Sequence, residues 1–311
     1  MMNTSPRAGA AVVIAIAVAA NAGCPVGNTD APGHDVTLAL STQTNPFFVQ
    51  VRDGARERAG ELGITLNVQD AGDDALKQAD QLGNALTTKP GVMLVNPVDS
   101  DAVGNSVVAL NQADIPVIAL DRASNGGRLT SYVASDNISG GKQAADAMAE
   151  AIGGKGKIVI VQGTPGTSAS RDRGAGFREK IATYPGIEVV AQQTAGFDRT
   201  KGLDVATNLL QSNPDIVGIF AENDEMALGA IEAAGPRAGK DIAIVGFDGT
   251  AEGLAAVKAG TMTATIAQQP RALGAEAVSQ AKLLLEGKSI ADVVPVPVVT
   301  VDRRNISEFA E

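Results

Sequence analysis

Cysteine, histidine and tryptophan are almost absent from this chain of 311 residues, which has one Cys, one His and no Trp. A single cysteine excludes an internal disulfide framework. Together with a single histidine it supplies too few ligands for a Cys/His zinc site, and this scarcity argues against a Cys–His nucleophile pair within the fold. We therefore expect no metal and no cofactor. Aromatic side chains are also scarce, with seven Phe and two Tyr, so the position of each one is informative.

Basic residues are in deficit, because 25 Lys and Arg stand against 35 Asp and Glu, giving a net charge of −10. Nucleic acid and anionic membrane surfaces both attract basic faces, so this charge opposes binding to either. The length is sufficient for more than one core. Alternating strand and helix patterns, rich in Ala, Gly and Val, predict an α/β protein with parallel sheets.

Residues 1–24 have the features of a signal segment. Arg7 precedes an apolar run over residues 8–20, which is too short for an ordinary membrane-spanning helix and is typical of a secretory signal. Residues 25–34 are then expected to form a flexible tether. The sequence therefore predicts an exported protein, located in the periplasm or anchored to the cell surface.

Two endings of the signal segment compete. Residues 20–22, Ala-Asn-Ala, fit the small-x-small pattern of a soluble secreted protein. Residues 22–24, Ala-Gly-Cys, resemble the end of a lipoprotein signal, after which the cysteine carries the lipid. Because Cys24 is the only cysteine of the chain, we favour lipidation, although Asn21 departs from the usual aliphatic residue. A free thiol near the N-terminus is the alternative.

The stretch Ser41–Phe48 stands out within the predicted exported part. It follows an apolar run over residues 36–40 and precedes a helical pattern. Phe47 and Phe48 are adjacent there and share the stretch with Ser41 and Asn45. Flat apolar faces beside hydrogen-bonding side chains suit a small polyhydroxy ligand.

From residue 35 onward, strand and helix patterns alternate in two successive series, which predicts two doubly wound parallel-sheet lobes. In the first series we expect helices to begin near residues 48, 75 and 100, the last capped by Asp99 or Ser100. The predicted strands are 36–40, 65–69, 92–95, 116–120 and 130–134 in the first series, 157–161, 187–192, 216–221, 242–247 and 262–267 in the second, and a closing strand over 296–301.

Polar and aromatic residues gather at the carboxyl ends of these strands, which in doubly wound sheets meet in one crevice. Capping of the following helices is the simpler explanation, and we prefer it for Asp99, Ser100 and Thr250. It is less convincing for Asp121-Arg122 and for Asp248. The residues at the strand ends are Ser41, Asn45, Asn96, Asp121, Arg122, Ser135, Phe197, Asn223, Asp248 and Gln268, and Arg173 begins a helix after one strand.

The charges of these residues favour a neutral ligand, because Arg122 and Arg173 offset Asp121 and Asp248. Carboxylates accept hydrogen bonds from sugar hydroxyls, guanidinium groups donate to them, and amides do both. The C–H face of a sugar ring lies well against Phe. A monosaccharide is therefore the expected ligand.

Several motifs resemble those of the bacterial periplasmic D-ribose-binding proteins, the sugar-binding components of ABC importers in the type I periplasmic binding protein family. The similarity extends from about residue 36 to about residue 301. The motifs are Ser41-Thr42-x-x-Asn45-Pro46-Phe47-Phe48, Asn96-Pro97-x-Asp99-Ser100-Asp101-Ala102-Val103, Leu120-Asp121-Arg122, Ala134-Ser135-Asp136-Asn137, Gly166-Thr167-Ser168-Ala169-x-Arg171-x-Arg173-Gly174, Asn223-Asp224-Glu225-Met226-Ala227-Leu228-Gly229, Val245-Gly246-Phe247-Asp248-Gly249 and Thr265-Ile266-Ala267-Gln268.

The resemblance implies two lobes joined by a three-segment hinge, which close on one sugar and deliver it to the permease of an ABC importer. Phe47, Phe48 and Phe197 would stack on the ring. The hydroxyls would be bound by Asn45, Asp121, Arg122, Arg173, Asn223, Asp248 and Gln268, with Ser41 nearby and Asn96, Ser135, Thr164 and Phe247 as secondary candidates.

The resemblance also suggests lobe boundaries and partners. The N-terminal lobe would comprise residues 35–135 and 269–295, and the C-terminal lobe residues 136–268 and 296–311. We expect a monomer that binds D-ribose and an importer permease, with a chemoreceptor as a further candidate partner. Glu222 and Thr164 depart from the residue types expected for the family, and either could change the preferred sugar if its side chain faces the cleft.

Three alternatives remain open at this stage. The Gly-rich loop 163–168 raises the question of an enzyme, but it lacks the Gly-Lys-Ser/Thr of a P-loop. A sugar-responsive repressor would carry a basic helix-turn-helix where this chain has the apolar segment. The third alternative keeps the fold and changes the ligand to another pentose, to a hexose such as allose or galactose, or to a furanosyl signal molecule.

Overall fold

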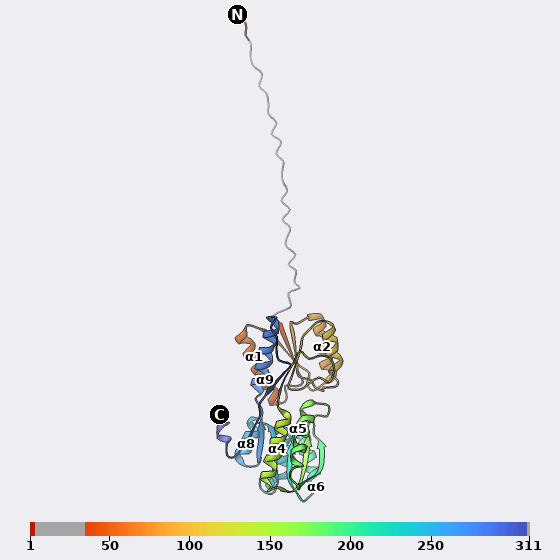
Figure 1. Cartoon of the computed structure of the whole chain (residues 1–311), viewed down its shortest axis with the longest axis vertical. Helices are drawn as coiled ribbons and strands as arrows, with labels where there is room; N and C mark the ends of the chain where they lie inside the picture. Colours follow the sequence, from red (N-terminus) through yellow and green to blue (C-terminus); the bar gives the residue numbers. More distant parts are fainter. Residues whose placement is uncertain (4–34, 310–311) are drawn as a thin grey trace. The chain divides into compact units, whose positions relative to one another are not determined.

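The computed structural model describes residues 1–3 and 35–309. Cys24, the tether and nearly all of the predicted signal segment lie outside the described residues. The chain from residue 35 forms two α/β lobes, each built on a six-stranded sheet (Figure 1). Within the described residues, no helix combines the length and apolar character needed to cross a membrane.

The first sheet is parallel throughout, as the series of apolar strands predicts. Its central strands are buried on both faces, which explains their continuous apolar runs rather than an alternating pattern. The strands are β1 (Asp35–Leu40), β2 (Thr65–Asp70), β3 (Val92–Val95), β4 (Val117–Leu120), β5 (Ser131–Ser135) and β11 (Val293–Val296), in the order β11-β5-β4-β3-β1-β2.

Helices cover both faces of the first sheet, and Figure 1 shows α1 and α9 on one side with α2 on the other. The helices are α1 (Pro46–Leu62), α2 (Ala75–Thr88), α3 (Gly104–Gln112) and α9 (Pro270–Leu285). α1 and α9 can approach closely because Gly54 has no side chain: a Cβ there would lie 2.2 Å from the carbonyl oxygen of Arg271.

The second sheet repeats this plan with one exception at its edge. β12 runs antiparallel to β10, whereas the other pairs are parallel. The strands are β6 (Lys155–Gln162), β7 (Gly186–Thr194), β8 (Ile216–Ala221), β9 (Ala243–Asp248), β10 (Ala264–Ala267) and β12 (Val299–Asp302), in the order β12-β10-β9-β8-β6-β7.

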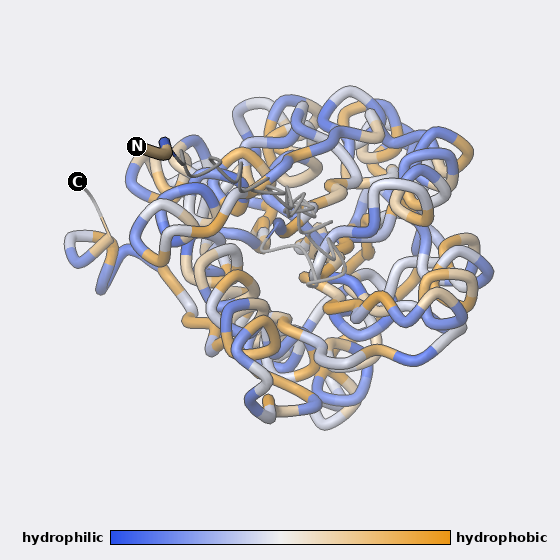
Figure 2. Tube along the Cα trace, turned by 90° about the horizontal axis from the view of Figure 1, so that it is seen from above, coloured by the Kyte–Doolittle hydropathy of each residue, from blue (hydrophilic) through white to orange (hydrophobic). Residues whose placement is uncertain are grey.

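Two helices cover one face of the second sheet and three pack on the other. On the first face, the rings of Phe177 and Phe220 are stacked with their centroids 4.2 Å apart. Along the helices, hydrophilic and hydrophobic residues alternate (Figure 2). The helices are α4 (Asn137–Ala151) and α5 (Ser168–Ile181) on that face, α6 (Arg199–Ser212), α7 (Asp224–Ala234) and α8 (Ala251–Ala259) on the other, and two short 3₁₀ turns, η1 (Gly235–Arg237) and η2 (Ile306–Glu308), follow α7 and β12.

Two predicted elements differ from the structure. The single closing strand predicted over residues 296–301 is wrong, because β11 ends at Val296 in the first sheet and β12 begins at Val299 in the second. Pro297 lies between them, and proline has no amide hydrogen to continue a ladder. The chain therefore changes sheets within two residues, and the expected boundary at 295/296 falls inside β11.

The start of α3 also differs from the prediction. The helix begins at Gly104, and its N-cap residue, Val103, makes no side-chain capping bond. Asp99 instead closes a turn ahead of the helix, where its Oδ1 accepts from the amides of Asp101 and Ala102, both at 2.8 Å. Ser100 is fully buried and faces the other lobe.

Candidate ligand-binding site

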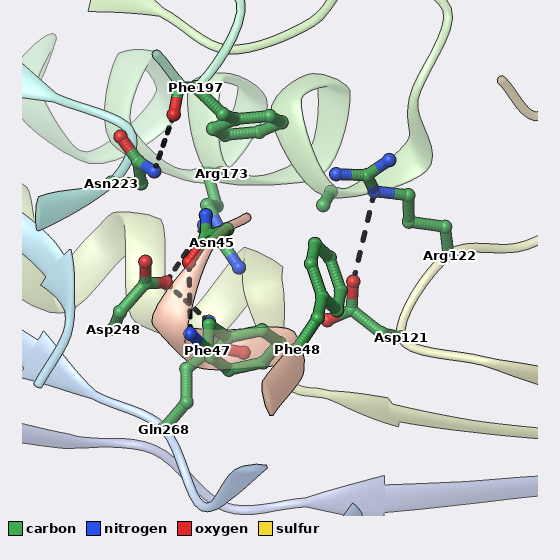
Figure 3. Close-up of a pocket in the computed structure, with 11 residues that line it drawn as sticks. Asn45, Phe47, Phe48, Asp121, Arg122, Arg173, Phe197, Asn223, Asp248 and Gln268 are labelled. Carbon is green, nitrogen blue, oxygen red and sulfur yellow. Dashed lines mark hydrogen bonds and ion pairs between the residues drawn. The ribbon is translucent and has the colours of Figure 1, made fainter. Parts of the chain in front are cut away.

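A cavity of about 260 Å³ lies at the carboxyl ends of strands from both sheets (Figure 3). It contains every residue predicted as a primary ligand contact except Ser41. Its lining residues are Asn45, Phe47, Phe48, Asp121, Arg122, Ala169, Arg173, Phe197, Asn223, Asp248 and Gln268.

Aromatic rings line the cavity from both lobes. The side chain of Asn45 caps α1 by accepting from the amide of Phe47 at 2.9 Å, which fixes both phenylalanines in the first turn. The rings of Phe47 and Phe48 meet edge to face, with centroids 5.2 Å apart. Phe197 faces them from the second lobe, and its ring lies over Gly163, where a Cβ would be 2.1 Å from Cζ. Gly163 is therefore required for this position of the ring.

Asp121 and Arg122 form the charged part of the first lobe's side of the cavity (Figure 3). Nε of Arg122 lies 3.8 Å from Oδ2 of Asp121, and both side chains are almost fully buried. The guanidinium also donates from NH1 to the carbonyl of Pro97 at 3.0 Å. Its Cζ lies 5.1 Å from the Phe48 centroid and 5.5 Å from that of Phe197, within the range of a cation–π contact.

Arg173, Asp248 and Gln268 form the corresponding group in the second lobe. Oδ1 of Asp248 accepts from Nε2 of Gln268 at 2.7 Å and lies 3.5 Å from NH1 of Arg173. Arg173 is oriented by two further bonds, from Nε to Asn137 Oδ1 at 2.9 Å and from NH1 to the carbonyl of Glu222 at 2.7 Å. The guanidinium is thus held in place on one side.

Asn223 fulfils both roles that the sequence suggested for a residue at a strand end. Its Oδ1 caps α7 by accepting from the amide of Met226 at 2.9 Å. Its Nδ2 donates to the carbonyl of Phe197 at 3.2 Å, and the residue lines the cavity. Capping and a place in the cavity are therefore compatible for this side chain.

Three cavity residues have a backbone conformation that L residues rarely adopt. The φ angles of Asp121, Phe197 and Asp248 are +63°, +63° and +129°. Such conformations cost about 1–3 kcal/mol each and cluster where function requires them. In this fold they turn each side chain from its strand or loop into the cavity.

Burial alters the pKa values of both cavity carboxylates. Desolvation raises the pKa of Asp121, and the charges of Arg122 and Arg173 act against this rise. Desolvation likewise raises the pKa of Asp248, opposed by Arg173 and increased by Asp224. Within the described part, buried Asp121 Oδ1, Arg122 Nε and Gln268 Oε1 have no hydrogen-bond partner. A buried polar atom without a partner costs about 1–3 kcal/mol, so each of these atoms favours a ligand that can bond it.

Ser41 and Asn96 contact each other rather than the cavity. Both are fully buried, and Asn96 Oδ1 accepts from the Ser41 amide at 3.1 Å and from its hydroxyl at 2.7 Å. Nδ2 of Asn96 donates to the carbonyl of Leu120 at 3.1 Å, beside Asp121. These two residues support the strand ends from behind.

The other secondary candidates lie around the cavity. Phe247 is fully buried beneath Arg173, whose Cζ is 3.9 Å from the ring centroid. Thr164 lines an adjoining cavity of about 650 Å³ that shares Asn45, Phe48, Arg122 and Phe197 with the first. Ser135 is buried at the end of β5, and its hydroxyl has no partner among the described residues.

The carboxylate of Glu222, which the sequence marked as unusual, does not line the cavity. It accepts from the amide of Gly163 at 2.7 Å and bonds the hydroxyl of Ser170. Ala169 does line the cavity but was not predicted. Ala169 lies in the first turn of α5, and an alanine has no polar or aromatic group that could have marked it in the sequence.

The comparisons with known proteins agree with this geometry. A family model described as a periplasmic binding protein domain matches residues 36–289. The chain belongs to this family. The ribose import binding protein of Haemophilus influenzae is one curated relative. It is 45% identical to this chain over 274 residues, which are 88% of this chain and 93% of the relative. That of Bacillus subtilis is 41% identical over 262 residues, 84% of this chain and 85% of the relative.

Solved structures are similar as well. An ABC transporter solute-binding protein from Actinobacillus succinogenes with bound D-allose has a TM-score of 0.83 and 34% identity, over 88% of this chain and 99% of the other. The Caulobacter myo-inositol-binding protein has a TM-score of 0.84 and 31% identity, over 89% and 96%. The predicted fold is confirmed, and so is the prediction that this periplasmic binding protein is not an enzyme, because its relatives are import binding proteins.

Proposed function

We propose that this exported protein captures one monosaccharide, D-ribose, in the cavity between its lobes and delivers it to the permease of an ABC importer. The observation that carries the proposal is the composition of the cavity, in which phenylalanine rings from both lobes face two carboxylate–guanidinium pairs. Ribose import binding proteins at 45% identity support the choice of sugar.

The site chemistry supports a sugar in detail. Phe47, Phe48 and Phe197 offer apolar faces to the C–H surfaces of the ring. The hydroxyls would pair with the buried polar atoms that lack a partner within the described residues, those of Asp121, Arg122 and Gln268 among them. Asn45, Arg173, Asn223 and Asp248 complete the set proposed to bind the ligand.

Capture would proceed by closure of the two lobes. We propose lobes of residues 35–135 with 269–296 and of 136–268 with 297–311, with the last boundary moved from the expected 295/296 because Val296 pairs with Ser135 in the first sheet. A ligand that contacts both lobes stabilises the closed state relative to the open one, and this difference in affinity drives closure. The radius of gyration in small-angle scattering should fall when ribose is added, and an unchanged value would contradict closure.

Three finer parts of the proposal concern location and partners. Cys24 would carry a lipid that anchors the protein to the membrane, which mass spectrometry of the mature N-terminus tests directly. The protein would act as a monomer, which light scattering with and without ribose measures. A chemoreceptor would be a second partner, recognising the closed form.

A thermal-shift panel tests the choice of sugar. A ligand that binds only the folded protein raises its apparent stability by about 2.7 kcal/mol at a concentration 100 times Kd. We expect D-ribose to give the largest shift among pentoses and hexoses. A larger shift with D-allose, the ligand of one solved relative, would retain the transport role and change the sugar. The absence of any shift across the panel would refute sugar capture.

A further inference from the structure

The segment between β6 and α5, residues 163–170, contacts the first lobe outside the sugar cavity. The amide of Ser100 donates to the carbonyl of Gly166 at 3.2 Å. Ser100 Oγ accepts from the amide of Ser168 at 3.2 Å, and Ser168 Oγ accepts from the amide of Ala123 at 2.8 Å. Ser100 and Ser168 are 0% and 1% exposed, and neither lines the cavity. These three bonds therefore join the lobes independently of the ligand contacts.

The 163–170 segment comes close to the first lobe at Gly166. Its φ of +85° is in the region that favours glycine, and a Cβ there would lie 2.0 Å from Oδ2 of Asp99. The position of the 163–170 segment must therefore be accurate for the contacts with Ser100 and Ala123 to form.

Glu222 holds both ends of this segment. Its Oε2 accepts from the amide of Gly163 at 2.7 Å and bonds the hydroxyl of Ser170. The side chain is 0% exposed, and Oε1 has no partner among the described residues. Gly163 in turn supports the ring of Phe197. One buried carboxyl group is thus connected both to the bonds between the lobes and to an aromatic wall of the cavity.

We propose that Glu222 is a positioning residue for sugar capture, which in its neutral form holds residues 163–170 where they bind the first lobe. The proposal deepens the sugar-capture function and rests on it. It predicts that the segment is held firmly under mildly acidic conditions and less firmly above neutral pH.

The direction of this effect follows from burial. Desolvation is the largest effect and raises the pKa of Glu222 to about 7, although the hydrogen bonds from Gly163 and Ser170 and the charges of Arg173 and Arg178 of α5 act against the rise. Its contacts on the segment, Gly163 and Ser170, carry no charge. The carboxylate of Asp224 is bonded by Thr250 and Thr265 instead.

Protonation stabilises whichever state has the higher pKa, which here is the state with the segment held over the carboxyl group. With a pKa of about 7 when the segment is held and about 4.3, the value of a solvated glutamate, when release exposes the carboxyl group, the equilibrium constant for holding falls about tenfold between pH 6 and pH 8. Glu222→Gln has the shape of the neutral acid and no proton to lose, so it should hold the segment equally at both values.

Hydrogen exchange in the ligand-free protein measures the holding directly. Protection of the amides of Gly163 and Ser170, whose acceptors both lie in the second lobe, should fall up to about tenfold from pH 6 to pH 8 in the wild type after correction for the intrinsic rate. In E222Q it should stay constant. Equal pH dependence in the two proteins would overturn the proposal. Both proteins contain Asp121 and Asp248, whose pKa values are also raised by burial, so these residues cannot account for a difference between them.

Calorimetric titration with D-ribose tests the coupling to capture. Wild-type affinity should weaken by up to about tenfold from pH 6 to pH 8, whereas E222Q should keep its affinity. Ser168→Ala, which removes the acceptor for Ala123, should weaken binding of every sugar by the same factor and keep the wild-type pH profile. Ser212→Ala, at the exposed end of α6, is the matched control and should change nothing.

The two possible failures are distinguishable. If exchange shows the Glu222 effect but no sugar binds, the proposed function is wrong and the holding of the segment remains. If ribose binds with the same pH profile in wild type and E222Q, sugar capture stands and the role of Glu222 in it is refuted.

Discussion

Replacing Asp248 by alanine should weaken ribose binding strongly while leaving the second lobe folded. Both protein contacts of this carboxylate are made by Oδ1, to Gln268 and to Arg173, so Oδ2 is available for a sugar hydroxyl. Arg173 keeps its other bonds, to Asn137 and to the carbonyl of Glu222, in the variant. The substitution therefore removes a ligand contact without releasing the guanidinium.

The size of the effect follows from the charge on the acceptor. A hydrogen bond to a charged group contributes about 1.5–3 kcal/mol, which corresponds to about a 10- to 140-fold rise in Kd. Asp248→Asn keeps the shape and an acceptor oxygen but loses the charge beside Arg173, so we expect an intermediate value.

Isothermal titration calorimetry with D-ribose gives Kd for both variants, and circular dichroism verifies that each is folded. Asp241→Ala, which changes an exposed acid away from the cavity, is the control and should bind as the wild type does. If Asp248→Ala binds ribose with nearly normal affinity, the carboxylate does not contact the ligand and the proposed site is incorrect.

Three further substitutions test the structure around the site. Gly163→Ala should weaken ribose binding at least tenfold, because the new Cβ would displace the ring of Phe197, and calorimetry measures this. Asp224→Ala should lower the free energy of unfolding by about 2–5 kcal/mol, since it leaves several buried donors unpaired. The same change at exposed Asp241 should alter it by less than about 0.5 kcal/mol in urea denaturation. Glu222→Gln should raise the free energy of unfolding at pH 8 by up to about 3 kcal/mol and have little effect near pH 4.5. Because burial raises the pKa of Glu222 to about 7, the neutral carboxyl group contributes its full stabilisation below about pH 4.5, and this stabilisation is lost as the pH rises through about 7. An equal effect at both pH values would contradict that linkage.

The strands and most cavity residues could be predicted because one rule connects them. In a doubly wound sheet the carboxyl ends of parallel strands meet, so a polar or aromatic residue just after a strand is a candidate. Asp121, Asp248 and Gln268 line the cavity as that rule predicts. The rule cannot tell a side chain that faces the cavity from one that turns sideways, and for this reason Ser41 was predicted to contact the ligand although its hydroxyl bonds Asn96.

Other features depend on contacts between distant residues and could not be predicted. Ser100 bonds the second lobe 68 residues away instead of capping a helix, and α3 begins only at Gly104. The direction of the Glu222 side chain depends on where the 163–170 segment lies. Neither the contact of Ser100 with the second lobe nor the direction of the Glu222 side chain can be predicted from the local pattern of hydropathy.

The order of the strands also determines when this protein can fold. Each sheet is completed by one of the last strands of the chain, because β11 pairs with β5 and β12 pairs with β10. Neither sheet can be complete before a ribosome has made residues 293–302. Contacts between distant residues form slowly, so each sheet gains this edge strand late in folding. An exported protein benefits from this delay, since it must reach its destination before it folds. Deletion of the last twenty residues should remove an edge strand from both lobes at once, although the sugar cavity lies elsewhere.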